Sequence, residues 1–480
     1  MIDLGTGGRR TTGGTLVAGV DSSTQSVKVV LCRADDGTVV ERYSAPHPDG
    51  TECHPRHWEE ALAGAAPLLR RAAAVSVAAQ QHGLVALDDQ GEVVRPALLW
   101  NDTRSAPQAA QLTKELGGPG WWADQTGSVP VAAFTVTKLR WLSEHEPDHA
   151  ERTASVLLPH DWLTWRLATA HESPGRAAGP STDRGDASGT GYWSPATGEY
   201  LPQVLVAALG RVPVVPRVAD PGEAVGQTRH GALVAPGTGD NMGAALGLGL
   251  APGEVVVSLG TSGTAFAVAD RPSADPSGAV AGFADATGRF LPLVCTLNAA
   301  RVLSSAATLL GVSLERLSDL ALEAPPGADG LVLLPYLDGE RTPDRPDATG
   351  VVHGLTTRNA TPANLARAAV EGMLAGLADA VESLRAQGVQ VSSVRLIGGG
   401  ARSEAVRRIA PAVLGVPVLV PAPDEYVALG AARQAAWVLG ERPPAWPGPP
   451  VEEYDAPPTP QVRERYATLR DRTADWRTQP

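Results

Sequence analysis

Short apolar runs separated by polar turns begin the chain. Residues 16–20 and 27–31 are two such runs, and the segment 21–26 between them is polar, which predicts a β-hairpin. A further apolar run at 75–79 predicts a strand that ends at the polar segment 80–83. Apolar residues at helical spacing predict helices at 105–116, 134–146, 159–168 and 200–209, and the segment 171–181, rich in proline and small residues, predicts a loop.

A second hairpin of the same design follows half a chain later. Residues 254–268 hold a Val-rich strand, a turn of Ser, Gly and Thr, and an apolar return strand. Two hairpins of similar shape indicate two domains of related fold. Beyond them the pattern predicts strands at 394–397 and 416–420 and helices at 361–387, 403–414, 428–439 and 463–476, and the Pro-rich segment 442–460 is expected to end the fold.

Composition narrows the class of protein. A length of 480 residues favours two or more domains, and 43% hydrophobic with 19% charged residues is typical of a globular chain. The net charge of -12 disfavours nucleic-acid binding. The three scattered cysteines suggest no disulfide framework, which fits a reducing, cytoplasmic location. Gly and Pro interrupt every long apolar run, so no membrane span is expected. The N-terminus lacks a basic flank followed by an apolar run, so no signal peptide is expected. Residues 1–14 are expected to be a disordered lead-in.

The turns of the two hairpins are candidate phosphate-binding loops. Tight turns of small hydroxyl and glycine residues expose consecutive backbone N–H groups, which bind phosphate oxygens without net positive charge. Asp21, in the first turn, could hold Mg²⁺ directly or through water, because this ion prefers oxygen ligands. The alternative is a pair of ordinary surface hairpins. The P-loop sequence GxxxxGK[ST] does not occur in the chain.

Asp240 is the candidate catalytic base. It precedes an Ala, Leu and Gly-rich helix that is predicted to run from Met242 to about Leu250. At an N-cap position the helix dipole and the free amides would keep its carboxylate ionised at neutral pH. Such a carboxylate beside a sugar hydroxyl can accept the proton as the oxygen attacks phosphorus. A purely structural N-cap is the alternative.

Three further segments are candidate binding sites. The polar clusters at 80–83 and 99–102 each end a predicted strand and could bind the hydroxyl groups of a polyol, with Trp100 as a stacking surface. For His82 a structural role is the alternative. The glycine-rich segment 398–402 joins a strand to a helix and would allow close approach of a nucleotide, although it does not match GxGxxG.

Taken together, residues 16–440 resemble the FGGY carbohydrate kinase family. The stretches that carry the resemblance are, in order, VAAQQHGLVALDDQGEVVRPALLWNDTRS, VLLPHDWLTWRL, STDRGDASGTGYW, GTGDNMGAALG, VVVSLGTSGTAF, LLPYLDGERTP and LIGGGARSE. The resemblance implies an α/β fold of two ribonuclease-H-like domains, related to actin and hexokinase, with a cleft between them. It places the domains at 15–247 and 248–442, followed by a Pro-rich tail and a short helix at 443–480.

The activity implied by the resemblance is ATP-dependent phosphorylation of a ketopentose, with D-xylulose as the expected acceptor and Mg²⁺ bound with ATP. Its partners would be this small sugar and ATP, without nucleic acid or membrane, and a homodimer is left open. Phosphorylation of another polyol or ketose (ribulose, gluconate, glycerol or an alditol) is one alternative. A catalytically silent sugar-binding protein of the same fold is the other.

The resemblance also assigns roles to single residues. Asp240 would be the catalytic base and, with Asp21, would lie at the Mg²⁺ ion. The implied sugar contacts are Gln81, His82, Trp100, Asp240 and Asn241. The implied ATP contacts are Ser23, Thr24, Lys28, Gly260, Thr261, Ser262, Gly399, Gly400 and Ala401. The chain departs from the family pattern at Ser23, where a glycine is usual, and at Gln81, where methionine is frequent.

Overall fold

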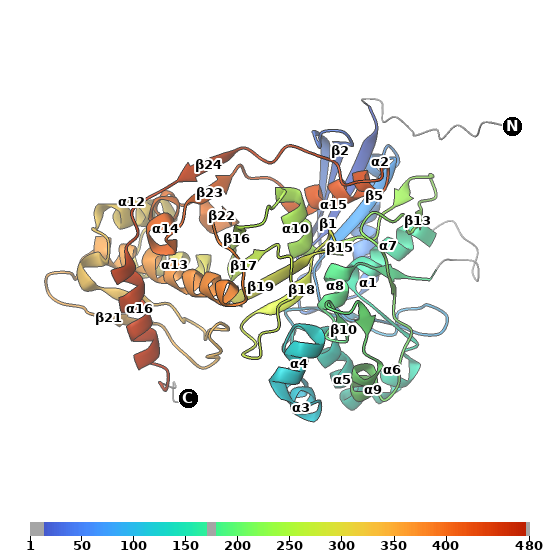
Figure 1. The fold of residues 1–480 in the computed structure, drawn as a ribbon, viewed down its shortest axis with the longest axis horizontal. Coiled ribbons are helices and arrows are strands. Elements are labelled where there is room, and N and C mark those ends of the chain that lie inside the picture. Colours follow the sequence, from blue (N-terminus) through green and yellow to red (C-terminus); the bar gives the residue numbers. More distant parts are fainter. Residues whose placement is uncertain (1–13, 170–178, 477–480) are drawn as a thin grey trace.

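Two mixed seven-stranded sheets organise the chain (Figure 1). The computed structural model describes residues 14–169 and 179–476. Residues 1–13 of the predicted lead-in and residues 171–178 of the predicted loop therefore lie outside the described residues. The last residue of that loop prediction is wrong, because strand β9 (Ser181–Thr182) begins at Ser181.

The first sheet contains the first predicted hairpin. Its strands are β1 (Leu16–Ser22), β2 (Ser26–Arg33), β3 (Val39–Pro46), β5 (Ala74–Ala79), β13 (Gly226–Gln227), β14 (Leu233–Val234) and β15 (Thr238–Gly239). β1 and β5 are parallel and almost wholly buried, as expected of continuous apolar runs, whereas the edge strand β3 is largely exposed. β15 pairs with the end of β5 at Ala78 and Ala79. This pairing brings the residue after β15, Asp240, beside the polar segment that follows β5.

The second sheet repeats this arrangement. Its strands are β16 (Glu254–Leu259), β17 (Gly263–Ala267), β18 (Ala281–Ala284), β19 (Phe290–Thr296), β22 (Ser393–Ile397), β23 (Val418–Pro421) and β24 (Val451–Tyr454). In both sheets the first strand lies between an antiparallel hairpin partner and a parallel strand. The two-domain α/β prediction is thus confirmed. The Pro-rich segment does not end the fold, however, because β24 lies within it at the sheet edge, where proline is tolerated.

Helices cover both sheets, and a helical lobe extends the first domain. The helices of the first domain are α1 (Pro55–Ala63), α2 (Ala66–Leu69), α3 (Ala106–Glu115), α4 (Gly118–Thr126), α5 (Thr135–His145), α6 (Pro147–Arg152), α7 (Pro159–Thr169), α8 (Arg184–Ser188) and α9 (Pro202–Leu209). Of these, α3, α4, α5, α6 and α9 gather in the lobe at the lower right of Figure 1. Short strands complete the connections: β4 (Glu52–Cys53), β6 (Val85–Leu87), β7 (Ala97–Leu98), β8 (Ser155–Leu157), β10 (Trp193–Ser194), β11 (Glu199–Tyr200) and β12 (Arg217–Val218).

The second domain is built around one long helix. Its helices are α11 (Ala300–Leu310), α12 (Leu314–Glu323), α13 (Pro362–Ala386), α14 (Glu404–Leu414) and α16 (Pro460–Arg472), and a hairpin is formed by β20 (Val332–Leu334) and β21 (Val351–His353). The side chain of Thr361 caps α13 by accepting a hydrogen bond from the Asn364 amide, with Pro362 in the first turn. In residues 14–169 and 179–476 no helix, α13 included, is both long enough and apolar enough to cross a membrane.

Two helices lie side by side between the sheets (Figure 1): α10 (Asp240–Leu248) and α15 (Tyr426–Trp437). Their close approach requires glycine, because a Cβ at Gly430 would lie 1.8 Å from the Gly243 carbonyl oxygen. α15 also packs on β1 and β5 of the first sheet, although it lies near the end of the chain. The start of α10, and with it Asp240, is therefore positioned by segments from both halves of the sequence.

Candidate active site

Asp240 is the first residue of α10 and lies in a cavity lined by both domains. The N-cap is Gly239, so the prediction that Asp240 is itself the N-cap is wrong by one residue. Its Oδ1 accepts hydrogen bonds from the backbone N and the side-chain Nδ2 of Asn241, each at 2.8 Å. Burial raises the pKa of Asp240 from 3.8 to about 6, although the Asn241 hydrogen bonds act to lower it. At pH 7 the carboxylate is still about ten times more abundant than the acid.

The interdomain cavity, of about 260 Å³, holds the residues expected to contact a sugar. Gln81, His82, Trp100, Asp240 and Asn241 all line it. From the second domain it is lined by Ser258, Thr264, Gly278, Ala279, Val280, Ala281, Phe283, Leu293, Cys295 and Arg341. Its walls thus combine a few polar groups with apolar surface from both domains, the composition typical of a small-molecule site.

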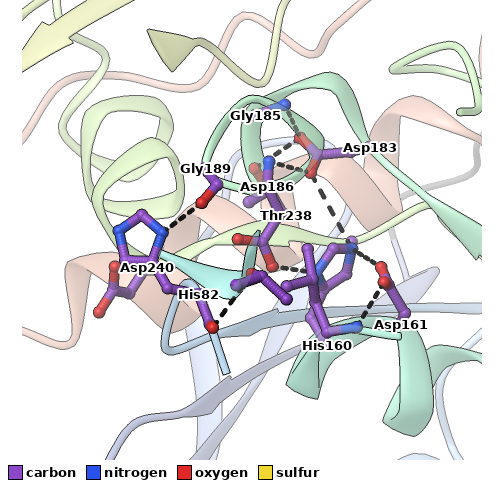
Figure 2. A network of polar contacts seen from close by, with 12 residues as sticks. His82, His160, Asp161, Asp183, Gly185, Asp186, Gly189, Thr238 and Asp240 are labelled. Carbon is purple, nitrogen blue, oxygen red and sulfur yellow. Dashed lines mark hydrogen bonds and ion pairs between the residues drawn. The ribbon is translucent and has the colours of Figure 1, made fainter. Parts of the chain in front are cut away.

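His82 presents one specific nitrogen to the interdomain cavity. Its Nδ1 lies 2.6 Å from the carbonyl oxygen of Gly189 (Figure 2), and because a carbonyl oxygen only accepts, Nδ1 carries the proton. Burial lowers the pKa of His82 to about 3, so the ring is neutral at pH 7. Its Nε2 is consequently a hydrogen-bond acceptor, which suits a sugar hydroxyl. The ring is held by stacking on Phe134 at 4.8 Å between centroids, and its backbone has φ +68, which is rare outside glycine.

Trp100 connects the interdomain cavity to the first hairpin turn. Its side chain is 42% exposed, and its Nε1 donates to the Thr24 hydroxyl at 2.8 Å. That hydroxyl donates in turn to Gln80 Oε1 at 3.2 Å. Ser23 closes the turn by donating from its hydroxyl to the Ser26 carbonyl at 3.0 Å. An indole fixed in this way provides a flat surface at the cavity without an unsatisfied N–H group.

Two further cavities contain most of the residues expected to bind ATP. The glycine-loop cavity, of about 650 Å³, is lined by Gly260, Thr261, Gly399 and Gly400 among others. The Asp21 cavity, of about 660 Å³, is lined by Asp21, Lys28, Gly399 and Ala401 among others. Ser23, Thr24 and Ser262 lie in the hairpin turns and line none of these three cavities.

The three cavities form a series. Ser258 lines both the interdomain cavity and the Asp21 cavity. Gly399 and Arg402 line both the Asp21 cavity and the glycine-loop cavity. The Asp21 cavity therefore lies between the other two, where the phosphates of a nucleotide would approach a sugar.

Asp21 is a buried carboxylate with an unused oxygen. It is 5% exposed, and its Oδ1 has no hydrogen-bond partner among the described residues. Burial, and then the nearby charge of Asp240, raises the pKa of Asp21 to about 7, whereas Lys28 opposes the rise. Lys28 itself forms a 2.7 Å ion pair with Glu425, a residue that the sequence did not suggest for the site.

This carboxylate pair fits the Mg²⁺ that the family resemblance implies. Two like charges that resist ionisation together, one with a free oxygen, are stabilised by a divalent cation. The parts of the chain that the structure describes contain no cluster of three His, Cys, Asp or Glu side chains that could hold a metal ion. Two carboxylates are enough, because Mg²⁺ usually takes only one or two from the protein and completes its shell with water and phosphate oxygens.

Several residues of the interdomain cavity were missed by the sequence reasoning. Arg341 lies in the stretch LLPYLDGERTP, which entered only as part of the family resemblance. The preceding Glu340 is buried and accepts hydrogen bonds from Leu297 N at 2.6 Å and Asn298 Nδ2 at 2.9 Å, which anchors the loop. Phe134 and Phe283, which pack around His82, carried no signal beyond being apolar.

Comparison with known proteins assigns the family. Residues 16–247 match the N-terminal domain model of the FGGY family of carbohydrate kinases, and residues 255–439 match its C-terminal domain model. A xylulose kinase from Streptomyces coelicolor is 49% identical over 443 residues, which are 89% of this chain and 88% of that protein. A xylulose kinase from Escherichia coli is 35% identical over 443 residues, which are 87% and 89% of the two chains.

Solved structures agree with these relatives. The crystal structure of xylulose kinase from Bifidobacterium adolescentis has a TM-score of 0.90 at 44% identity, covering 95% of this chain and 99% of that chain. Glycerol kinase from Plasmodium falciparum shares the fold, with a TM-score of 0.81 at 17% identity, covering 97% and 99% of the two chains. The chain therefore belongs to the FGGY family of carbohydrate kinases.

Proposed function

We propose that this enzyme transfers the γ-phosphoryl group of ATP to D-xylulose, giving D-xylulose 5-phosphate and ADP. The observation that carries the proposal is the position of Asp240, whose carboxylate lines an interdomain cavity of sugar size beside a second carboxylate, Asp21. The xylulose kinases among its relatives share about half or a third of its sequence and cover most of its length. They support D-xylulose as the acceptor.

Asp240 acts as the general base. It takes the proton from the primary hydroxyl of the sugar as that oxygen forms a bond to the γ-phosphorus. The bond between the γ-phosphorus and the bridging oxygen breaks, and ADP leaves with the electron pair. Because the pKa of Asp240 is about 6, the carboxylate is both ionised at neutral pH and more basic than an ordinary aspartate.

The other residues of the interdomain cavity orient the sugar. Gln81 Oε1 lies 3.4 Å from Asn241 Nδ2, so the two amides form one polar surface beside Asp240. The Nε2 atom of His82 accepts a hydrogen bond from a sugar hydroxyl, and Arg341 donates one from the opposite domain. Trp100 covers the opening. Because both domains line the cavity, their closure around the sugar excludes water, a competing acceptor for the phosphoryl group.

ATP occupies the glycine-loop cavity and reaches the sugar through the Asp21 cavity. Backbone N–H groups of the second hairpin turn and of the segment at Gly399 face the phosphates. Asp21 and Asp240 would hold Mg²⁺, which would neutralise charge on the phosphates. Lys28 is placed to exchange its ion pair with Glu425 for a phosphate oxygen. Since ATP is the donor, the reaction belongs to the cytoplasm.

A sugar panel in a coupled ADP-release assay tests the proposal. The acceptors are D-xylulose, D-ribulose, D-gluconate, glycerol and xylitol, each with Mg-ATP and with a control lacking sugar. The expected result is a kcat/KM for D-xylulose at least about tenfold above that of every other acceptor, the difference that a few hydrogen bonds produce. A different preferred acceptor would overturn the choice of sugar. Binding of sugar and ATP without ADP release would overturn the kinase assignment.

A further inference from the structure

Two of the family-like stretches have no part in the three cavities. VLLPHDWLTWRL contributes His160 and Asp161 at the start of α7, and STDRGDASGTGYW contributes Asp183 and Asp186 around α8. None of these four residues is more than 3% exposed. Figure 2 shows them gathered in one network that includes Thr238. Four buried ionisable groups in contact are costly unless each is paired.

His160 is the cation of this network. Its Nδ1 lies 2.5 Å from Asp186 Oδ2, and its Nε2 lies 3.2 Å from Asp161 Oδ1 (Figure 2). Burial alone would lower the pKa of His160, but Asp161 and Asp186 reverse the effect and raise it to about 9. The ring is therefore an imidazolium at neutral pH. Its Nδ1–H donates to Asp186, whereas Nε2 lies within ion-pair distance of Asp161 but has no hydrogen-bond partner among the described residues.

One branch of the network reaches the catalytic base. Asp183, whose Oδ1 is 3.9 Å from His160 Nε2, is the N-cap of α8 and accepts from the amides of Gly185 at 2.9 Å and Asp186 at 2.8 Å. Its Oδ2 also accepts the hydroxyl of Thr238 at 2.8 Å. Thr238 belongs to β15 and precedes Asp240 by two residues. The cap of α8 and the strand carrying the base are thus fixed by the same carboxylate.

The other branch reaches the sugar-facing histidine. Gly189 directly follows α8, and its carbonyl oxygen accepts the hydrogen bond from His82 Nδ1 at 2.6 Å. The fit is close, since a Cβ at Gly189 would lie 2.9 Å from the His82 ring. Displacement of α8 would release this bond, and His82 could then rotate or exchange its tautomer. The acceptor nitrogen that faces the cavity depends on the position of α8.

We propose that His160 is a positioning residue: by holding the carboxylates of Asp183 and Asp186 at the start of α8, it fixes the orientation of His82 and Asp240 toward the sugar. The inference rests on the sugar kinase function proposed above. It differs from a role in stability alone, because it predicts a selective effect on the sugar. The glycine-loop and Asp21 cavities have no lining residue in the network, so ATP binding should be spared.

A matched pair of threonine variants tests the positioning role of the network without removing a charge. Thr238→Val removes only the hydroxyl that binds Asp183. Thr153→Val is its control, because Thr153 is equally buried, also donates one 2.8 Å hydrogen bond, to His149 O, and lines none of the three cavities. We expect Thr238→Val to lower kcat/KM for the sugar about tenfold with KM for ATP within about twofold of the unaltered protein, since small misplacements of reacting groups are costly. Thr153→Val should keep both parameters within about twofold.

His160→Gln is the second variant, because glutamine can donate to Asp186 but carries no charge. A kcat/KM for the sugar lowered about 100-fold, again with KM for ATP preserved, would support the proposal. If Thr238→Val behaves like Thr153→Val, or if it impairs sugar and ATP parameters equally, the proposal is overturned even when His160→Gln fails to fold. The kcat/KM of each variant is divided by that of the unaltered protein, measured with whichever sugar of the panel the unaltered protein phosphorylates. A wrong choice of acceptor would appear in the unaltered protein alone. Failure of the positioning role would appear only in these ratios.

Discussion

Asp240→Asn should abolish turnover and at the same time stabilise the fold. Asparagine has nearly the same shape, so the cavity and the start of α10 are preserved, but its amide cannot accept the proton of the sugar hydroxyl. General bases typically contribute 10²–10⁴-fold to a rate, and we expect kcat to fall by about 10³ or more. KM for ATP should change much less than kcat, because the glycine-loop cavity is untouched and both Asp21 and the side-chain oxygen of the new asparagine remain as oxygen ligands for Mg²⁺.

The gain in stability follows from the pKa of Asp240. Burial raises it from 3.8 to about 6, so the folded state binds this proton more tightly than the unfolded chain does. The ionised carboxylate therefore destabilises the fold fully above about pH 6, and the effect vanishes below about pH 4. A difference of about 2 pKa units corresponds to at most about 3 kcal/mol, reduced by solvent that reaches the cavity. The variant should thus unfold a few degrees higher at pH 7.5 and at an unchanged temperature near pH 4.

The measurements are thermal unfolding at both pH values, without Mg²⁺ or nucleotide, and ADP release at pH 7.5. Asp148→Asn is the matched control, because Asp148 is exposed on α6 and should affect neither property. Near-normal turnover of Asp240→Asn would refute the role of the base. A lower unfolding temperature at pH 7.5 would refute the electrostatic reasoning, because it would mean that the fold depends on the charge.

Three other predictions follow from the site and its support. Because the pKa of Asp240 is raised to about 6 by burial, kcat/KM for the sugar should be level from pH 7 to 8 and fall about tenfold per pH unit well below 6; a profile that stays level to pH 5 would contradict this. Arg341→Met should raise KM for the sugar about 10–100-fold, the contribution of one charged hydrogen bond, and should leave KM for ATP unchanged. Arg358→Met, at an exposed arginine, is the control and should leave both KM values unchanged. An unaltered KM for the sugar in Arg341→Met would show that the guanidinium makes no contact with it. Gly430→Ala places a Cβ against the Gly243 carbonyl oxygen, so the backbones of α10 and α15 must separate. The unfolding temperature in a thermal scan should fall by several degrees. An unchanged unfolding temperature would mean that the two helices are not packed this closely.

Local sequence patterns predicted much of the fold because they act over a few residues. The hairpins, the strand at 75–79 and the helix at 361–387 were found within one or two residues of their observed positions, since apolar spacing and caps determine such elements directly. Gln81 was named because polar residues that end a strand are recognisable in one dimension, whereas Asn241 was named only through the family resemblance. Arg341 was missed because an arginine in a loop has no local signature.

The sequence by itself determined the order of elements, the repeat of two hairpins, the family and the identity of Asp240 as the candidate base. Tertiary structure alone decided its environment: α15, almost 190 residues away, packs against the helix that carries it, and burial raises its pKa to about 6. It also decided that Lys28 pairs with Glu425 and that His160 meets three aspartates. The physical reason is that desolvation and charge pairing depend on which distant segments pack together, whereas periodicity and capping depend only on neighbours along the chain.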